Sequence, residues 1–366
     1  MKILFIAPLP PPITGNSLAA KIIYNELIKY HKVVLLDLSK GSFKQGINSF
    51  ERIIKVVGIL RGVWAKCTDV DVIYITISQS YSGNIRDIMF YLICFHNLNK
   101  VVIHLHGGGI KKLLFDKNRI LEKINKFFIK RIGDVIVLGP SLFTIFSNMV
   151  PKRRIHVVPN FAEKHLYLSN EKIENKFQMT SPLRILFMSN LIIGKGYEEL
   201  IDAYHGLSKE LQKLLRIDFA GSFESDDDKK KFLKKVDGFE RIHYHGIVDG
   251  AEKKDLFARA HIFCLPTYYY YYEGQPISIL EAYASGCAVI TTDHGGIRDI
   301  FKDGINGFEV QKKSSKSIKL VIEKIIDNIG QLLPMALSNR KTAHNKYRIS
   351  NHISSMLAII ERERFL

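Results

Sequence analysis

Apolar residues along this chain occur in short uninterrupted runs, separated by segments in which apolar residues recur with a helical period. The runs predict buried strands at 3–7, 33–38, 72–77, 101–105, 135–138 and 155–158, and then at 185–188, 217–220, 242–245, 262–265 and 288–291. Helical periodicity fills the segments between them, for example 18–30 and 50–64. Apolar strands that alternate with helices are typical of parallel sheets covered on both faces. The pattern therefore predicts a doubly wound α/β fold.

The alternation lapses once, in a polar stretch between residues 161 and 182. We therefore expect an N-terminal Rossmann-like domain at 1–165, a linker at 166–182, a C-terminal Rossmann-like domain at 183–345 and a C-terminal helix at 346–366. A length of 366 residues fits two domains of about 150 residues each. Open parallel sheets bind ligands outside the carboxyl ends of their strands, so we expect the two domains to face a central cleft.

Composition is that of a globular protein, with 46% hydrophobic and 24% charged residues. The longest apolar stretches fall short of the roughly 20 residues that span a bilayer. The first residues lack the core and cleavage site of a signal peptide. Four cysteines lie far apart, which predicts neither a disulfide framework nor a metal site. These features lead us to expect a cytoplasmic protein.

Positive charge is concentrated in the first half of the chain. The protein has 53 Lys and Arg against 36 Asp and Glu, a net charge of +17, and residues 1–180 hold 26 of the former and only 12 of the latter. This asymmetry points to an anionic partner, either a membrane surface or nucleic acid. The alternative is that proteins of the source organism generally carry excess charge, which keeps them soluble. A basic helix is expected at 111–132. Its apolar stripe is interpreted first as core contact, with anionic lipid as the alternative partner.

The most informative stretch follows the expected strand at 262–265. A loop carries five tyrosines at 268–272 and then Glu273, a helix begins near Ile277, and Glu281 lies about one turn inside it. The free amides of Ile277 and Ser278 suit a diphosphate, and the two carboxylates suit the hydroxyls of a sugar or ribose. The tyrosines are interpreted as packing on their own neighbours, or as stacking on an acceptor sugar or lipid headgroup.

The spacing of the two glutamates is weak evidence alone, because Glu163 and Glu171 repeat it. Their setting is more specific, since a Gly-x-Pro, a Glu-Ala, a Ser-Gly and the strand at 288–291 accompany them in order. In this setting the sequence resembles the retaining glycosyltransferases of family four, also called glycosyl transferases group 1, which have the two-domain GT-B fold. The resemblance extends over most of the chain and implies that the C-terminal helices cross back to the first domain.

Further matches to this family lie along the chain. They are Gly15-Asn16 after the first strand, His106-Gly107, Val158-Pro159-Asn160, the run from Tyr244 to Val248 that would cover the base, Gly295-Gly296-Ile297 and the run from Asp303 to Gly307. The resemblance implies catalytic roles for Glu273, His106 and Lys195. It implies donor binding by Gly15, Asn16, Asn190, Lys195, Val248, Gly274, Gln275, Ile277, Ser278 and Glu281.

By the same resemblance, Glu281 would hold the nucleotide ribose and Glu273 the donor sugar. His106 would orient that sugar from the first domain, with His104 as a rival. Two positions depart from the family pattern. Asn190 stands where arginine is usual, which leaves Lys195 as the remaining cation at the diphosphate. Gln275 stands where an aromatic residue is common.

We therefore expect retaining transfer of a sugar from a nucleoside diphosphate, UDP foremost, to an acceptor hydroxyl. The expected acceptor is a lipid-linked saccharide in bacterial surface polysaccharide biosynthesis, and the expected location is the inner face of the plasma membrane. No cofactor and no metal are expected, since neither Asp69-Val70-Asp71 nor 226–228 follows an apolar strand.

Other classes of protein remain as alternatives. A sugar-nucleotide epimerase or hydrolase could use the same fold. A basic protein that binds nucleic acid or membrane without catalysis would explain the charge, but no nucleic-acid recognition module is visible, so no nucleic acid is expected as a partner. A nicotinamide enzyme would need more than Gly15 in the first loop.

Overall fold

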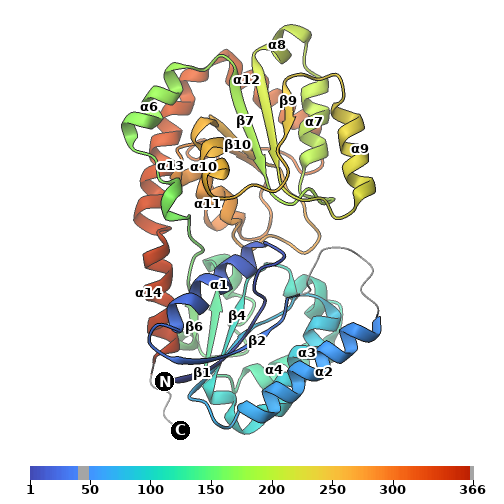
Figure 1. Cartoon of the computed structure of the whole chain (residues 1–366), viewed down its shortest axis with the longest axis vertical. Coiled ribbons are helices and arrows are strands. Elements are labelled where there is room, and N and C mark those ends of the chain that lie inside the picture. The colour runs from blue at the N-terminus through green and yellow to red at the C-terminus, as the bar shows by residue number, and fades with distance from the viewer. Residues whose placement is uncertain (40–48, 363–366) are drawn as a thin grey trace. The chain divides into compact units, whose positions relative to one another are not determined.

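The computed structural model describes residues 1–39 and 49–362. They form two compact units (Figure 1). The first comprises Met1–Asn160, Tyr271–Gln275 and Ser350–Leu366, and the second comprises Phe161–Tyr270 and Pro276–Ile349. The last four residues of the range expected as a C-terminal helix, 363–366, lie outside the described residues.

The first unit is built on a six-stranded parallel sheet with the strand order β2-β1-β3-β4-β5-β6. The strands are β1 (Lys2–Ala7), β2 (Lys32–Asp37), β3 (Val72–Thr76), β4 (Val101–Leu105), β5 (Asp134–Val137) and β6 (Ile155–Val157). The helices are α1 (Gly15–Leu27), α2 (Ser49–Lys66), α3 (Tyr81–Ile93), α4 (Arg119–Ile129), α5 (Pro140–Phe143) and α14 (Ile349–Ile360), of which α14 begins at the last residue of the second unit.

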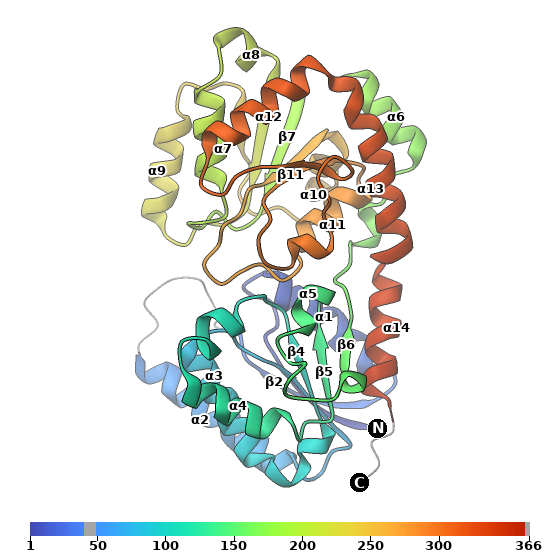
Figure 2. The same cartoon turned by 180° about the vertical axis from the view of Figure 1, so that it is seen from behind.

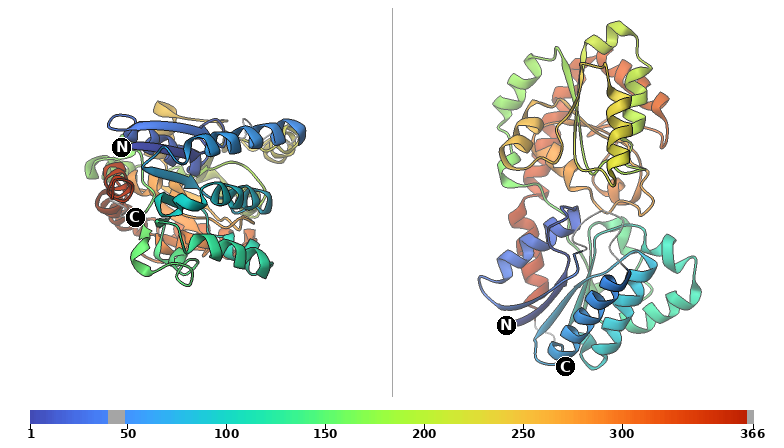
Figure 3. Two further views of the ribbon diagram at one scale, coloured as in Figure 1. Left: turned by 90° about the horizontal axis from the view of Figure 1, so that it is seen from below. Right: turned by 45° about the vertical axis from the view of Figure 1, so that its right-hand side comes forward.

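Side chains alternate between two buried layers on the faces of this sheet. Ile3 of β1 packs in one cluster with Ile23 of α1 and Met356 of α14. Leu4, the next residue of β1, packs in the other cluster with Phe128 of α4. The helices on either side can be followed in Figures 2 and 3. Both faces are therefore covered, as the continuous apolar strands predict.

The second unit has its own six-stranded parallel sheet, with the strand order β12-β11-β10-β7-β8-β9. The strands are β7 (Leu183–Met188), β8 (Leu215–Ala220), β9 (Ile242–Tyr244), β10 (Ile262–Leu265), β11 (Ala288–Thr291) and β12 (Gly307–Glu309). The helices are α6 (Asn170–Gln178), α7 (Tyr197–His205), α8 (Lys209–Lys213), α9 (Asp226–Val236), α10 (Gly250–Arg259), α11 (Ile277–Ala284), α12 (Ser315–Asp327) and α13 (Leu332–Lys346).

Both sheets reverse their winding direction beside the first strand of the unit. In the first sheet β1 lies between β2 and β3, and in the second sheet β7 lies between β8 and β10. Ligands of doubly wound sheets bind outside the carboxyl ends of the strands at such a switch point. The loops after β1, β7 and β10 are therefore the places to look for a site.

The predicted fold class is confirmed, and the return of the C-terminal helix to the first unit is confirmed by the packing of α14 on β1. None of the helices in 1–39 and 49–362 is long and apolar enough to cross a membrane.

The segment expected as a linker, 166–182, differs from that expectation. It contains helix α6 and belongs to the second unit. Lys176 of α6 is buried, and its Nζ donates to the carbonyls of Ala260, Ser285 and Gly286 at 2.8, 2.9 and 2.7 Å. A lysine that caps the carbonyl ends of two helices fixes this segment to the unit.

The single basic helix expected at 111–132 is also wrong. The chain forms a short helical turn, Lys111–Phe115, and then α4. Asn118 separates them, because its side chain accepts hydrogen bonds from the backbone N–H groups of Ile120 and Leu121, both at 3.0 Å. This N-cap starts a new helix rather than continuing the old one.

Candidate functional site

The loops that follow β7 and β10 are packed backbone against backbone at the switch point of the second sheet. Gly194 and Gly196 have φ of +91° and +88°, a region that favours glycine. The N–H of Tyr268 donates to the Gly194 carbonyl at 2.7 Å. A Cβ at Gly196 would lie 2.5 Å from the Pro266 carbonyl oxygen. Glycine is therefore required for this close approach.

Lys195 lies between these two glycines. Its Nζ is 4.7 Å from the ring centroid of Tyr269, a cation–π contact that holds the ammonium beside the loop after β10. Asn190, also after β7, accepts a hydrogen bond from the Ser222 hydroxyl at 3.0 Å. Asn190 is thereby tied to the loop after β8, and Lys195 supplies the positive charge of the β7 loop.

Helix α11 follows the loop after β10 and begins at Ile277, as predicted. Pro276 occupies its N-cap position, makes no side-chain capping hydrogen bond, and the first turn contains no acidic residue. The amides of Ile277 and Ser278 at this end therefore carry the partial positive charge that attracts a phosphate or another anion.

Glu281 of α11 is only 2% exposed and is part of an ion network. Its Oε1 accepts a hydrogen bond from Lys253 Nζ at 2.6 Å, and the same Nζ donates to Glu163 Oε1 at 2.7 Å. Burial raises the pKa of Glu281 to about 7, because it outweighs the attraction of Lys253, and the neighbouring Glu163 adds to the rise. The site thus holds a carboxylate that titrates near neutrality.

Sequence reasoning missed both partners of Glu281. Lys253 lies on α10, and Glu163 precedes α6 at the edge of the stretch expected as a linker. The two carboxylates hold the pKa of Lys253 above its usual value despite its burial. No local motif marks either residue, since Lys253 lies 28 positions from Glu281 and 90 from Glu163.

Val248 lies in the loop after β9, where the family resemblance expects a cover for the base. Its side chain is half-buried and packs against the core of the second unit. Nearby, the Tyr244 hydroxyl donates to the Gly221 carbonyl at 2.9 Å, and His245 Nε2 lies 2.8 Å from Asp218 Oδ1. The carboxyl ends of β8 and β9 are thus joined by polar contacts.

In the first unit, His106 lies directly after β4. Neither of its ring nitrogens has a hydrogen-bond partner among the described residues, although both are buried. Its ring centroid is 3.8 Å from that of His104. Burial, with a contribution from His352, lowers the pKa of His106 to about 3, so the imidazole is neutral at physiological pH. A neutral ring with two open nitrogens can both donate and accept a hydrogen bond.

His104, the rival candidate, is bound to a neighbouring side chain through one ring nitrogen. It is completely buried, and its Nδ1 forms a hydrogen bond of 2.7 Å with the Tyr74 hydroxyl. Burial lowers its pKa well below the usual value. The contact with Tyr74 favours a structural role for His104 and leaves His106 as the stronger candidate for contact with a ligand.

The segment Tyr271–Gln275 packs in the first unit against the glycine-rich loop after β4. The N–H of Gly108 donates to the Tyr272 carbonyl at 3.4 Å, and a Cβ at Gly274 would collide with the His106 carbonyl. Glu273, 9% exposed, lies within this segment. The loop of His106 and the loop of Glu273 therefore lie against each other.

Gln275 has a packing role in the same unit. Its Oε1 accepts from the backbone N–H of Asn160 at 3.0 Å, and Asn160 Nδ2 donates to the Gln275 carbonyl at 2.8 Å. These two hydrogen bonds join the segment Tyr271–Gln275 to Asn160, which lies shortly after β6. Gln275, which stands where an aromatic residue is common in the family, is thus hydrogen-bonded to Asn160.

Gly15 is the first residue of α1, after the loop that follows β1. Thr14 caps this helix, with a reciprocal hydrogen-bond pair to Ser17. Asn16 Oδ1 is buried with no hydrogen-bond partner within the described part of the chain. The two predicted residues thus lie at the switch point of the first sheet.

The five tyrosines are divided between the units. In the second unit, the Tyr268 hydroxyl donates to Glu199 Oε1 at 2.6 Å, and Tyr269 contacts Lys195. In the first unit, Lys112 Nζ is 4.8 Å from the Tyr272 ring centroid. These contacts agree with the interpretation that the tyrosines pack on their neighbours.

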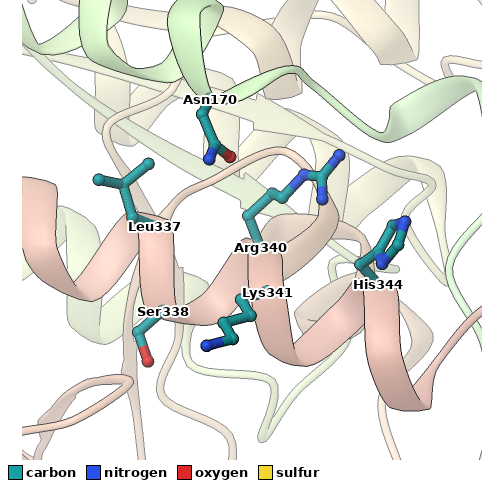
Figure 4. A pocket seen from close by; sticks show the side chains of 6 residues that line it. All are labelled: Asn170, Leu337, Ser338, Arg340, Lys341 and His344. Carbon is teal, nitrogen blue, oxygen red and sulfur yellow. The ribbon is translucent and has the colours of Figure 1, made fainter.

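A cavity of about 440 Å³ opens between α6 and α13 in the second unit (Figure 4). Its lining residues are Asn170, Leu337, Ser338, Arg340, Lys341 and His344. The lining contains none of the predicted site residues. Among residues 1–39 and 49–362, no group of three or more His, Cys, Asp or Glu side chains is arranged to hold a metal ion.

Solved structures resemble the whole chain. Anabaena HepE in complex with UDP gives a TM-score of 0.74 at 17% identity and covers 99% of this chain and 100% of that chain. WaaG, a glycosyltransferase involved in lipopolysaccharide biosynthesis, gives a TM-score of 0.71 at 12% identity and covers 98% of this chain and 99% of that chain. Together with the two doubly wound sheets, this likeness defines the GT-B fold class.

Sequence comparison adds the family. Residues 169–343 match the family model described as glycosyl transferases group 1. An uncharacterized glycosyltransferase of Methanocaldococcus jannaschii is 25% identical over 71% of this chain and 67% of its own length. The capsular polysaccharide biosynthesis glycosyltransferase CapM of Staphylococcus aureus is 27% identical over 62% of this chain and 60% of its own length.

The amylovoran biosynthesis glycosyltransferase AmsK of Erwinia amylovora is 22% identical over 72% of this chain and 64% of its own length. The matches to these curated relatives thus span about two thirds of their lengths. The match to the group 1 glycosyltransferase model covers residues 169–343, just under half of this chain.

Proposed function

We propose that the protein transfers a sugar from a nucleoside diphosphate to an acceptor hydroxyl with retention of anomeric configuration, and that the donor is a UDP-sugar. The observation that carries this proposal is the arrangement at the switch point of the second sheet. Lys195, the uncapped end of α11 and the buried Glu281 lie within the segment that matches the family model.

Each of these groups suits one part of such a donor. Lys195 and the amides of Ile277 and Ser278 bind the diphosphate and stabilise the charge that develops on it as the sugar departs. Glu281 accepts hydrogen bonds from the ribose. Because the protein itself supplies this positive charge, the proposed reaction needs neither a metal nor a cofactor. Anabaena HepE, solved with UDP and with UDP-glucose, supports the choice of donor.

In the first unit we assign His106 and Glu273 to the donor sugar. The neutral imidazole of His106 can exchange hydrogen bonds with a sugar hydroxyl without adding charge. Glu273 is held by the packing of Gly274 on the His106 carbonyl. Gly15 and Asn16, after β1, complete the donor-binding residues of this unit.

The proposed acceptor is a lipid-linked saccharide of bacterial surface polysaccharide assembly, which the enzyme reaches from the inner face of the plasma membrane. CapM and AmsK, both named for polysaccharide biosynthesis, support this choice. The first unit also exposes apolar side chains. On α4, Ile120 and Phe127 are 72% and 43% exposed, and the Phe127 ring lies 6.2 Å from that of Phe95, which is 39% exposed.

At least one lysine lies beside this apolar face, since Lys130 Nζ is 5.7 Å from the Phe127 ring centroid. Lys123, Lys126 and Lys130 of the same segment are exposed. Exposed apolar side chains beside cations are typical of proteins that bind anionic bilayers, where each Lys or Arg near the surface contributes about 1 kcal/mol. The buried part of the predicted stripe, Leu121 and Phe128, fulfils the core role.

Replacement of Glu273 by alanine tests the proposed chemistry. We expect Glu273→Ala to abolish transfer from a nucleotide sugar to a lipid-linked acceptor while the protein stays folded, because the donor sugar loses its carboxylate partner. Transfer is measured from product formation, and folding from circular dichroism. Undiminished transfer by a folded variant would refute the role of Glu273. Release of free sugar without transfer by the wild type would indicate a hydrolase instead.

A further inference from the structure

The ion network around Lys253 contains a second carboxylate, that of Glu163, beside the proposed ribose-binding Glu281. Lys253 Nζ donates to Oε1 of Glu281 at 2.6 Å and to Oε1 of Glu163 at 2.7 Å. The side chains of Glu281 and Lys253 are 3% and 12% exposed, whereas that of Glu163 is 28% exposed. One ammonium group therefore holds two carboxylates together at the edge of a buried site.

This geometry places a second carboxylate beside Glu281. Lys253 donates to Oε1 of Glu281, and the carboxyl groups of Glu281 and Glu163 also share a side-chain hydrogen bond. A ribose presents two neighbouring hydroxyl groups, each of which donates one hydrogen bond. Glu163, fixed beside Glu281 by the same Lys253 nitrogen, is a candidate acceptor for the second of these hydroxyls.

We propose that Glu163 and Glu281 together bind the two neighbouring hydroxyls of the nucleotide ribose, and that Lys253 is the positioning residue that holds the two carboxylates in register. This inference rests on the proposed function, since it names the groups that would recognise the donor's ribose. It adds Glu163 to the ligand-binding residues and gives Lys253 a role that no motif assigns.

Electrostatics supports the arrangement. Two carboxylates side by side repel each other, and removal of either from water is costly unless a cation compensates. Lys253 provides that cation, with its pKa held above the usual value by both glutamates. His165 Nδ1 lies 3.8 Å from Glu163 Oε2, so this imidazole also faces the network. Lys253 and His165 together hold the pKa of Glu163 below its usual value, although burial opposes them.

A purely structural network would behave differently. It would join α10 to α11 and to the segment before α6, and its loss would weaken every ligand alike through lower stability. A network that binds ribose hydroxyls instead discriminates between nucleotides that differ only in those hydroxyls. Deoxynucleotides therefore separate the two roles.

The experiment measures dissociation constants of UDP, GDP, ADP and CDP, and then of the 2′-deoxy and 3′-deoxy forms of the tightest binder, by calorimetry. Wild-type protein is compared with Glu163→Gln, which keeps the size of the side chain. We expect Glu163→Gln to weaken the ribonucleotide about tenfold, the value of one charge-assisted hydrogen bond, and to weaken one deoxynucleotide much less. Equal effects on all forms, or no effect, would overturn the proposal.

Lys253 is tested in the same way with a matched control. Lys253→Met should reduce the preference for ribonucleotide, Lys253→Arg should retain most of it, and Lys254→Met, an exposed neighbour on α10, should leave it unchanged. If Lys253→Met does not fold, Glu163→Gln and Lys253→Arg still decide the question. A preference that survives Lys253→Met in a folded protein would contradict the positioning role.

Failure of the donor site and failure of the role of Glu163 give different results. If none of the nucleoside diphosphates binds the wild type, the proposed function fails and this inference fails with it. If the wild type binds one and prefers ribose, but Glu163→Gln keeps that preference, the donor site stands and the role of Glu163 falls.

Discussion

The raised pKa of Glu281 predicts how the stability of the protein changes with pH. Burial raises it to about 7 from 4.5, so folding favours the protonated carboxyl. The stability from this group is fully present below pH 4.5 and is lost as the pH rises through about 7. The lowered pKa of Glu163 and the raised pKa of Lys253 lie outside this window.

We therefore expect the melting temperature of the wild type to fall between about pH 5 and pH 8 relative to Glu281→Gln, which has no titrating group at this position. Differential scanning calorimetry across this range measures both proteins. Parallel pH profiles for the two proteins would show that Glu281 does not titrate as the structure indicates.

The positions of candidate site residues could be predicted from the sequence where a local motif marks them. Lys195 between two glycines, Glu281 one turn into α11 and His106 before three glycines all lie in the loops or helix ends that the pattern indicates. Glu163 and Lys253 could not be predicted, because they are 90 residues apart and meet only through the fold.

The buried Lys176 anchors helix α6 through three hydrogen bonds, and this role can be tested. Lys176→Met should lower the free energy of unfolding by about 3 kcal/mol, because three buried carbonyls lose their donor. Lys172→Met, on the exposed face of α6, is the matched control and should have little effect. Urea denaturation measures both. A Lys176→Met protein as stable as its control would contradict this account of α6.

The apolar face of α4 gives a second prediction for a single element. Wild-type protein should sediment with anionic phosphatidylglycerol vesicles at low salt, and less at high salt because salt screens the lysines. Phe127→Ser should weaken this binding, whereas Leu320→Ser, which changes an apolar residue of similar exposure on α12, should not. Equal sedimentation of the two variants would exclude this face as the contact.

Strands were predicted more reliably than helix boundaries. A buried parallel strand such as β4 is a continuous apolar run and is therefore recognisable in the sequence. The break before α4 was missed because it depends on a single capping side chain, Asn118. The sequence of α6 predicts a linker because its exposed faces are polar. The buried Lys176 cannot be distinguished from a surface lysine by sequence alone.

For the complete chain, two doubly wound units followed from the alternation of strands and helices. The assignment of Tyr271–Gln275 to the first unit did not, because it depends on the contact of Gly274 with the His106 carbonyl, which no local pattern encodes. The excess of positive charge lies in the half of the chain that forms most of the first unit.

A thermal-stability screen against nucleotides and nucleotide sugars, with and without a metal chelator, tests the central claim most directly. We predict that one UDP-sugar raises the melting temperature selectively, that chelator leaves this rise unchanged, and that Glu281→Ala abolishes it. No shift with any nucleotide or nucleotide sugar at concentrations far above a typical donor affinity would contradict the proposed donor site.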